Sequence, residues 1–417
     1  MNLIFRNMAL STAILLAVST PAFADIGSHR HGHDDFAPKA DAHTHGTETG
    51  NVRTGDKAIE IYGKLYMSLG YSDPGVSTDG DSPPNIIQMT SHSSTLGVRG
   101  NKTLTASTRL FWQIESQIDI NNLGESDHAE GGNGSVLAGS DSFVGVSGNA
   151  GTLLFGKHKT PLSMVVHDND PFMHIPGDAL YLLGRAGAHG RSAFDGGHGS
   201  MFYVRAPNSI VYMSPAISGF STNVALIGIN ESTKGKGVEM PGTSLSLNFK
   251  SNGLNLAYAF EQHKNLDKEI GDHDAIPAIE DEILDKTQIH LLSAMAHFPT
   301  TMVKFSAEQL EVKDAVVGNS ERTAYRMAVQ QMFGLHSLRG AYTLAGSFGD
   351  HSPGAGNGAQ QVAVSWFQTL SSDTQAYAVL AKTYNKEHGQ YGTSVFVDEA
   401  KEGADPTTLA MGLIHLF

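Results

Sequence analysis

The stretch that decides the fold is Trp112-Gln113-Ile114-Glu115-Ser116-Gln117-Ile118-Asp119-Ile120. Polar residues at 113, 115, 117 and 119 share one face of an extended chain, and mostly apolar residues share the other. A half-buried strand of a soluble sandwich has the same local pattern, so this stretch alone leaves both architectures open. Its recurrence along the chain favours a closed antiparallel barrel in a membrane, whose outward face meets lipid.

The alternation recurs in sixteen segments. After segments within 61–69, 94–100 and 112–120, the others cover residues 141–148, 152–159, 207–215, 220–229, 242–250, 254–263, 287–297, 301–311, 322–331, 337–347, 359–370, 374–384 and 406–417. Short turns such as Gly148-Asn149-Ala150-Gly151 alternate with long polar connections, which is typical of outer-membrane barrels. We therefore expect an all-β, 16-stranded antiparallel transmembrane β-barrel over residues 59–417, with both ends of the barrel at the periplasmic rim.

Residues 1–24 have the features of a secretory signal peptide. Arg6 supplies the positive start, an apolar stretch follows from Met8 to Val18, and Ala22-Phe23-Ala24 provides a small-residue cleavage site. A membrane anchor needs about 20 apolar residues, and this stretch is shorter. Residues 25–58 are polar without apolar periodicity, so we expect a disordered periplasmic extension. The absence of cysteine excludes disulfides.

Composition and charge limit the choice of partners. With 40% apolar and 17% charged residues, the chain is less apolar than a helical membrane protein, as a barrel should be. The formal charge is -14, and phosphate binding needs a basic face, so we expect no nucleic-acid partner.

Seven short motifs, in order, resemble those of the general Gram-negative porins of the neisserial and β-proteobacterial type. They are Ile61-Tyr62-Gly63-Lys64-Leu65, Ser94-Thr95-Leu96-Gly97-Val98-Arg99-Gly100, Phe111-Trp112-Gln113-Ile114-Glu115-Ser116, Phe143-Val144-Gly145-Val146-Ser147-Gly148, Leu154-Phe155-Gly156-Lys157-His158-Lys159-Thr160-Pro161, Asn208-Ser209-Ile210-Val211-Tyr212-Met213-Ser214-Pro215 and the terminal Leu413-Ile414-His415-Leu416-Phe417. The resemblance implies a trimeric outer-membrane channel for small hydrophilic solutes. It also implies that the third long loop folds into the lumen and places acidic residues opposite basic wall residues.

This sequence departs from the family pattern at three places. Val211 and Lys157 stand where the family often has arginine, and Ile414 with Leu416 replaces basic residues of the last strand. The selectivity of the anion-selective members is therefore not carried over.

The candidate constriction combines the longest connection, residues 160–206, with basic wall positions. Strand parity places Lys64 and Arg99 on the inward face with Glu115 nearby, while Lys157 matches the family's basic wall position. The loop contributes three carboxylates, Asp168, Asp170 and Asp178. Opposed rows of fixed charge would create a transverse field in the pore. The alternative is that these charges only line a polar lumen or pair with one another.

The net charge predicts weak cation preference, or little preference. Residues 264–286 contain a dense acidic run, made of Asp267, Glu269, Asp272, Asp274, Glu280, Asp281, Glu282 and Asp285. Such a run is usually a solvated loop. The alternative is that it binds Ca²⁺ or Mg²⁺, which would bridge it to anionic lipid head groups.

The N-terminal extension is unusual because of its imidazoles, which belong to His29, His31, His33, His43 and His45. Neutral imidazole suits zinc, copper or nickel, so the extension is a candidate zinc site beside the channel exit. A polar, unstructured extension without metal explains the same residues. A substrate- or metal-selective channel is accordingly the second function that we consider.

A barrel enzyme is the rival from another class. Gly196-Gly197-His198-Gly199-Ser200 lacks the strand–turn–helix context of a nucleophile elbow, so we predict no enzyme activity and no required cofactor. The terminal Phe417 resembles the family's assembly signal. The expected location is the outer membrane of a Gram-negative bacterium. The expected partners are outer-membrane lipid, lipopolysaccharide, the barrel-assembly machinery and two further copies of the chain in a homotrimer.

Overall fold

The computed structural model describes residues 57–118, 120, 137–185, 202–203, 205–228, 230–231, 238–239, 242–266, 284–314, 318–348 and 356–417. The predicted signal peptide, the histidines of the predicted extension, most of the acidic run and the Gly196–Ser200 segment lie outside these residues. In the described part, no helix is long and apolar enough to cross a membrane.

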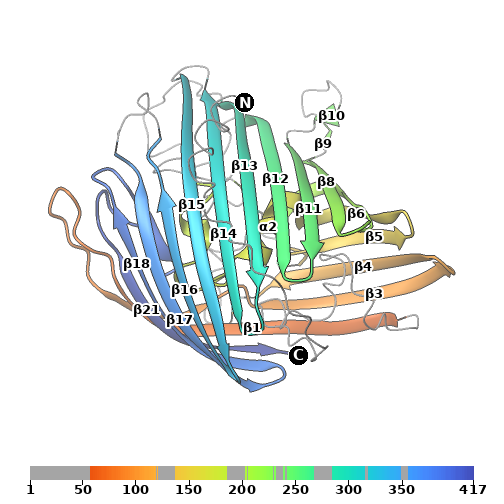
Figure 1. Cartoon of the computed structure of the whole chain (residues 1–417), viewed down its shortest axis with the longest axis horizontal. Helices are drawn as coiled ribbons and strands as arrows, with labels where there is room; N and C mark the ends of the chain where they lie inside the picture. Colours follow the sequence, from red (N-terminus) through yellow and green to blue (C-terminus); the bar gives the residue numbers. More distant parts are fainter. Residues whose placement is uncertain are drawn as a thin grey trace, which may run out of the picture.

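One closed antiparallel sheet forms the wall (Figure 1). Its strands are β1 (Lys57–Asp73), β2 (Ile86–Ser91), β3 (Thr95–Thr105), β4 (Thr108–Gln117), β5 (Ser142–Gly148), β6 (Gly151–Lys159), β7 (Arg205–Met213), β8 (Phe220–Ile227), β11 (Gly242–Ser251), β12 (Leu254–Leu266), β13 (Leu284–His297), β14 (Thr301–Asp314), β15 (Gly318–Phe333), β16 (His336–Ala345), β17 (Ala359–Ser371), β18 (Thr374–Asn385) and β21 (Thr407–Leu416). Each strand pairs with its neighbour, and β1 pairs with β21 to close the ring.

The second wall strand is interrupted. β3 pairs with the first half of β1, and β2 pairs with its second half, so β2 and β3 together occupy one strand position in the wall. The break lies at Ser93, whose φ is 46°. The 17 strands of the sheet therefore make sixteen positions around the wall, and the predicted 16-stranded barrel is confirmed.

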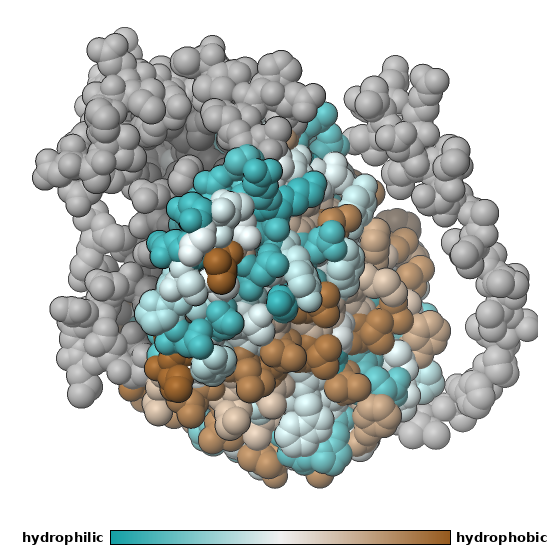
Figure 2. All heavy atoms as spheres, turned by 90° about the vertical axis from the view of Figure 1, so that its left-hand side faces the viewer, coloured by the Kyte–Doolittle hydropathy of each residue, from teal (hydrophilic) through white to brown (hydrophobic). Residues whose placement is uncertain are grey.

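The predicted alternation of side chains holds along the wall. On β15, the outward Tyr325 and Met327 are 46% and 52% exposed, whereas the inward Arg326 and Ala328 are 4% and 2% exposed. Figure 2 shows apolar residues gathered in a belt across one side of the outer surface, below a hydrophilic region. A belt of this kind suits the hydrocarbon layer, because a closed ring leaves no unpaired backbone group facing lipid.

The strand boundaries differ from prediction where inward residues are apolar. β4 begins at Thr108, four residues before the predicted start, because Phe111 faces inward although it is apolar. Phe111 packs with Leu154 in a buried cluster instead of lining water. Two apolar faces remove the alternation on which the sequence prediction depends.

Part of the long connection between β6 and β7 packs on the inner face of the wall. It contains α2 (Pro161–Asn169) and the short helix η3 (Ala179–Tyr181). Thr160 caps α2, because its Oγ1 accepts the amide hydrogen of Ser163 at 3.1 Å, and Pro161 fits the first helical turn. α2 contacts β11, β12 and β13 most extensively, and Leu162 N donates to the inward Ser244 Oγ. In Figure 1, α2 lies behind these strands.

Small residues make room for this loop on the wall. Ala328, Ala341, Ala363 and Ala381 are register partners across β15, β16, β17 and β18. Phe172 and Ile175, which are fully buried, pack on them. Gly177 has a φ of 92°, and a Cβ there would lie 2.3 Å from the Cβ of Ala363. Alanine at these inward positions therefore provides the space that the loop fills.

A second connection also turns inward, between β18 and β21. It contains β19 (Tyr391–Ser394) and β20 (Val397–Glu399), which pair as a hairpin, and every residue of β19 is buried. A separate small hairpin, β9 (Asn230–Glu231) with β10 (Val238–Glu239), extends beyond the ends of β8 and β11 (Figure 1).

Candidate pore constriction

Three inward arginines hold the loop between β6 and β7, here called the constriction loop (residues 160–206). Arg326 donates from Nη2 to Asp170 Oδ1 at 2.6 Å and to the carbonyl oxygen of Gly177 at 2.8 Å. Arg339 donates from Nη1 to the carbonyl oxygen of Pro171 at 2.8 Å. A buried ion pair supported by further hydrogen bonds fixes geometry, because breaking it leaves an unpaired charge in a poor solvent.

The third arginine pairs with a carboxylate that binds two described parts of the loop, at residues 184 and 203. Arg322 Nη2 donates to Glu308 Oε1 at 3.0 Å, and both side chains are fully buried. Glu308 also accepts from the amide nitrogen of Gly184 at 2.9 Å and from the hydroxyl of Tyr203 at 2.5 Å. One carboxylate on β14 thus receives donors from two distant parts of the loop.

Two of the three predicted loop carboxylates, Asp170 and Asp178, face the wall and the loop backbone. Asp170 is paired with Arg326 and also accepts the amide hydrogens of Phe172 and Ala179. Asp178 accepts the amide hydrogens of Leu180 at 2.8 Å and His174 at 2.6 Å. Burial, and then the neighbouring Asp170, raise the pKa of Asp178 above its ordinary value. Both carboxyls are 3% exposed, while the backbone oxygen of Asp168 receives Lys304 Nζ at 3.3 Å.

The predicted wall residues lie together on the opposite side of the barrel. Arg99 Nε is 3.2 Å from Glu60 Oε2, and its guanidinium lies 4.6 Å from the ring centroid of Tyr62. Glu115 accepts from the hydroxyl of Tyr62 at 3.0 Å and from Ser140 Oγ. The strands β1, β3 and β4 thus bring Arg99 and Glu115 into one network through Tyr62.

The two predicted lysines are on β1 and β6. Lys64 Nζ lies 5.5 Å from the ring centroid of Tyr66, and Lys157 donates to the carbonyl oxygen of Gly139. Both side chains are half-buried. The role of all these wall and loop residues in the constriction stays a prediction.

Two imidazoles of the constriction loop face a basic part of the wall. The rings of His167 and His174 are 5.9 Å apart between centroids. His167 Nδ1 donates to the carbonyl oxygen of Ser163 at 2.9 Å, and His174 Nδ1 is 3.1 Å from Ser93 Oγ on the far side of the lumen. The loop therefore reaches from the β11–β14 side to the break between β2 and β3.

The charges around this imidazole pair are mainly positive. Burial, and then Lys159 and Arg205, lower the pKa of His167 well below its ordinary value. Burial, and then Lys64, lower the pKa of His174 in the same way. One carboxylate, Asp141, opposes these charges on His167, and Arg205 Nε is 3.3 Å from it. Lys64, Lys159 and Arg205 thus act on the pair, Asp141 opposes them on His167, and the carboxylate of Asp178 accepts the amide hydrogen of His174.

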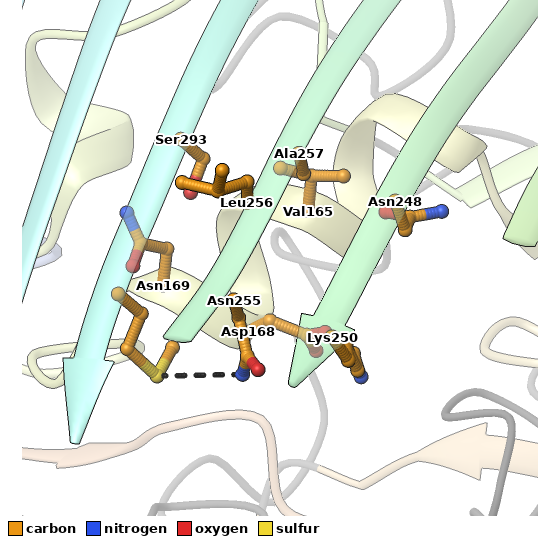
Figure 3. Close-up of a pocket in the computed structure, with 10 residues that line it drawn as sticks. Val165, Asp168, Asn169, Asn248, Lys250, Asn255, Leu256, Ala257 and Ser293 are labelled. Carbon is orange, nitrogen blue, oxygen red and sulfur yellow. Dashed lines mark hydrogen bonds between the residues drawn. The ribbon is translucent and has the colours of Figure 1, made fainter. Parts of the chain in front are cut away.

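The contact between α2 and the wall leaves a cavity of about 30 Å³ (Figure 3). Its polar lining consists of Asp168, Asn169, Asn248, Lys250, Asn255 and Ser293, and Asn255 Nδ2 donates to Met295 Sδ at 4.0 Å. A cavity of this size holds about one water molecule. A solute path behind α2 is therefore not available at this place.

Among the residues that the structure describes, no group of three or more histidine or carboxylate side chains is arranged to hold a metal ion. The zinc prediction for the N-terminal histidines and most of the Ca²⁺ or Mg²⁺ prediction concern residues outside that part.

Comparison with known proteins gives the family. The family described as Gram-negative porin matches residues 11–388 of the chain. A chitoporin of Vibrio furnissii is 30% identical over 208 residues, which are 50% of this chain and 49% of that protein. The major outer membrane protein P.IB of Neisseria gonorrhoeae is 23% identical over 277 residues, 65% of this chain and 70% of that protein. Here the chain spans about half the length of the chitoporin.

A solved structure has the same fold at low identity. The anion-selective porin from Comamonas acidovorans superposes with a TM-score of 0.69 and 18% identity, over 86% of this chain and 99% of that chain. The chain belongs to the Gram-negative porin family. The porin is a multi-pass β-barrel of the outer membrane, so the predicted family, location and channel class are confirmed. Family and fold indicate a channel rather than an enzyme.

Sequence reasoning missed the residues that anchor the constriction loop of this porin. Arg322 and Arg326 occupy inward positions of β15, and Arg326 lies between the outward Tyr325 and Met327. That alternation places both arginines inward from the sequence alone. Their partners Glu308 and Asp170 are 14 and 156 residues away, and local patterns carry no information about such contacts.

Proposed function

We propose that this porin is a passive diffusion channel for small hydrophilic solutes, with a narrow section that favours anions. The observation that carries the proposal is the orientation of charge. The loop carboxylates Asp170 and Asp178 are occupied by Arg326 and backbone amides, while the imidazole pair of the loop faces basic wall residues.

The cations concerned belong to β1, β6 and β7. Lys64, Lys159 and Arg205 act on the imidazole pair, and Asp141 opposes them on His167. Charges lining a narrow path act more strongly than charges on a surface, because low-dielectric walls focus their field. A net positive path lowers the energy of a passing anion and raises that of a cation.

The net charge of -14 supports the opposite expectation of weak cation preference. Residues 264–286 alone supply five of these negative charges, because they contain eight carboxylates and three lysines. Charges beyond a Debye length, about 8 Å at physiological salt, are largely screened. Charges within that distance of a permeating ion therefore matter more than the total charge of the chain, and we propose anion preference instead.

The experiment is the zero-current potential of the refolded porin in a planar bilayer under a KCl gradient. We expect chloride to permeate better than potassium. Replacing either Lys64 or Lys159 by glutamine removes one unit charge, worth roughly 1 kcal/mol across a few ångströms of water. After screening, each replacement should lower the chloride-to-potassium permeability ratio roughly threefold.

Lys102→Gln is the matched control, because Lys102 is an exposed residue of β3 next to the short turn. It should leave the ratio unchanged. Equal or greater permeability for potassium in the wild-type porin contradicts the proposed preference. The absence of conductance steps contradicts the channel itself.

The remaining expectations stand as proposals that the family supports. They are a homotrimer, contacts with outer-membrane lipid and lipopolysaccharide, insertion by the barrel-assembly machinery, and a constriction formed by Lys64, Arg99, Glu115, Lys157, Asp168, Asp170 and Asp178. Metal capture by the N-terminal histidines, as part of a metal-selective channel, is kept as the alternative. Zinc titration of a peptide covering residues 25–50 tests it.

A further inference from the structure

We propose that the hairpin connection between β18 and β21 (residues 386–406, here called the last-loop hairpin) is a second constriction element, which narrows the lumen together with the constriction loop. The proposal rests on the channel function given above and names the elements that determine its size limit. It follows from where the hairpin packs, what it spans and what it touches.

The hairpin is packed on the inner face of the wall. Thr393 Oγ1 is 2.6 Å from Thr408 Oγ1, and Thr408 Oγ1 is 2.8 Å from Ser72 Oγ on β1. Thr383 Oγ1 donates to the carbonyl oxygen of Gly392 at 2.7 Å. These wall residues occupy inward positions and are fully buried under the hairpin. The hydroxyl groups replace water as hydrogen-bond partners inside the barrel.

The hairpin tip crosses the seam where the barrel closes. Phe396 is 4% exposed, and its ring centroid is 5.7 Å from that of His92, just beyond β2. Gly70 of β1 lies under the same ring, because a Cβ at residue 70 would lie 2.5 Å from a ring carbon of Phe396. The hairpin thus extends from β18 over β21 to β1 and occupies inner surface that water would otherwise reach.

The last-loop hairpin and the constriction loop form one continuous barrier. Gly177 of the constriction loop donates its amide hydrogen to the carbonyl oxygen of Thr393 at 3.0 Å. Arg322 joins them a second time, since its Nη1 donates to the hydroxyl of Tyr391 at 2.8 Å and its Nη2 donates to Glu308. Glu308 in turn accepts from Gly184 and Tyr203. A single buried node therefore links the hairpin, the loop and the wall.

The base of the hairpin is also bound to the connection that follows β1. The amide nitrogen of Thr78, in the connection after β1, donates to the carbonyl oxygen of Glu402 at 2.9 Å, and Lys401 pairs with Asp81. With anchors at both ends, the hairpin has a fixed position. The proposal therefore places the open path on the side of the barrel that carries Arg99 and Glu115.

Shortening the hairpin tests the proposal. Lys382 and Thr407 are register partners, and Asn385 Nδ2 donates to the carbonyl oxygen of Ala404 at 2.6 Å. A short glycine–serine turn in place of residues 389–402 can therefore close the connection without stretching the wall. We expect the single-channel conductance in KCl to rise about twofold or more, and larger neutral sugars to enter liposomes that carry the variant.

The control shortens the β9–β10 connection, whose flanking residues Ile227 and Gly242 are register partners. That hairpin lies away from the lumen in Figure 1, so conductance should not change. Phe396→Ala is a milder second variant, which keeps the backbone intact and should give a smaller rise in conductance.

The measurements distinguish a failure of the proposed second constriction from a failure of the channel function. A refolded, shortened barrel or a Phe396→Ala barrel with wild-type conductance and sugar cut-off overturns the second constriction, even if anion preference persists. The absence of conductance steps in the wild-type porin as well overturns the channel function itself. A rise in both hairpin variants, with none in the control, supports the proposal.

Discussion

At the scale of single residues, this porin uses its inward charges for two different purposes. Arg322, Arg326 and Arg339 bind the constriction loop and the last-loop hairpin, whereas Lys64, Lys159 and Arg205 act on the imidazole pair of the loop. Burial separates the two groups, because a buried arginine needs partners that the loop backbone supplies. An inward charge in such a barrel is therefore not by itself a selectivity residue.

The Arg326–Asp170 pair gives the first stability prediction. Asp170→Asn keeps the shape but leaves a buried guanidinium without its counter-charge, so unfolding should become easier by about 3–5 kcal/mol. Arg326→Met should cost a similar amount, and the double variant should lose less than the sum of the two. Urea unfolding in detergent, followed by tryptophan fluorescence, measures all three.

The exposed ion pair of Lys401 and Asp81 is the control for the Asp170 and Arg326 variants. Its side chains are 52% and 50% exposed, so Asp81→Asn should change the unfolding free energy by no more than about 1 kcal/mol. Equal losses for Asp170→Asn and Asp81→Asn would show that the Arg326 pair does not hold the loop.

At the scale of elements, the rim end of the last-loop hairpin carries a titratable contact. His388 Nδ1 donates to Glu402 Oε1, and this hydrogen bond, more than the charge of Glu402, raises the pKa of His388 above its ordinary value. A raised pKa in the folded protein means that the contact stabilises the hairpin fully below about pH 6.5. The stabilisation disappears as pH rises through the folded pKa of His388.

Hydrogen exchange at the hairpin base checks this pH dependence. The amide of Gly403 donates to the carbonyl oxygen of Gly389 at 2.8 Å. Its protection from exchange, corrected for the intrinsic exchange rate, should fall as the pH rises through the folded pKa of His388. Glu402→Gln removes the charged partner, so the protection of Gly403 should no longer depend on pH in this range. Unchanged pH dependence in Glu402→Gln would exclude the His388 contact as its cause.

The elements also mark how far sequence can predict this structure. Alternation predicts the wall strands because lipid and the interior impose period two, as in β15 and β17. It fails at Phe111 and at β2, where inward apolar residues or a strand break remove the period. Alternation does not predict α2 or β19 either. Their positions depend on contacts between residues far apart in the sequence, which are Asp170 with Arg326 and Tyr391 with Arg322. Of the candidate site, parity predicts inward positions for Arg99 and Lys64, but the charges that surround them depend on contacts between distant strands.

At the scale of the whole molecule, the ring depends on one seam between the first and last strands. β21 pairs with β1 from Thr407 to Leu416, and Phe417 extends the seam. The amide nitrogen and carbonyl oxygen of Phe417 each exchange a 3.1 Å hydrogen bond with Gly63. The Phe417 ring covers Gly63, where a Cβ would lie 2.3 Å from a ring carbon. The absence of a side chain at residue 63 therefore lets the last residue pack onto the first strand.

Deleting Phe417 should separate assembly from stability. The deletion removes two backbone hydrogen bonds of about 1 kcal/mol each and a ring that is 52% exposed, so the refolded barrel should lose only about 2–3 kcal/mol. Insertion in cells should fall much further, because the terminal aromatic residue resembles the family's assembly signal. Leu413→Ala is the control, since Leu413 is 53% exposed on the same strand without being terminal. Comparing the porin recovered in outer membranes with urea unfolding of refolded protein tests this, and an equal loss of insertion in Leu413→Ala would refute a specific role for Phe417.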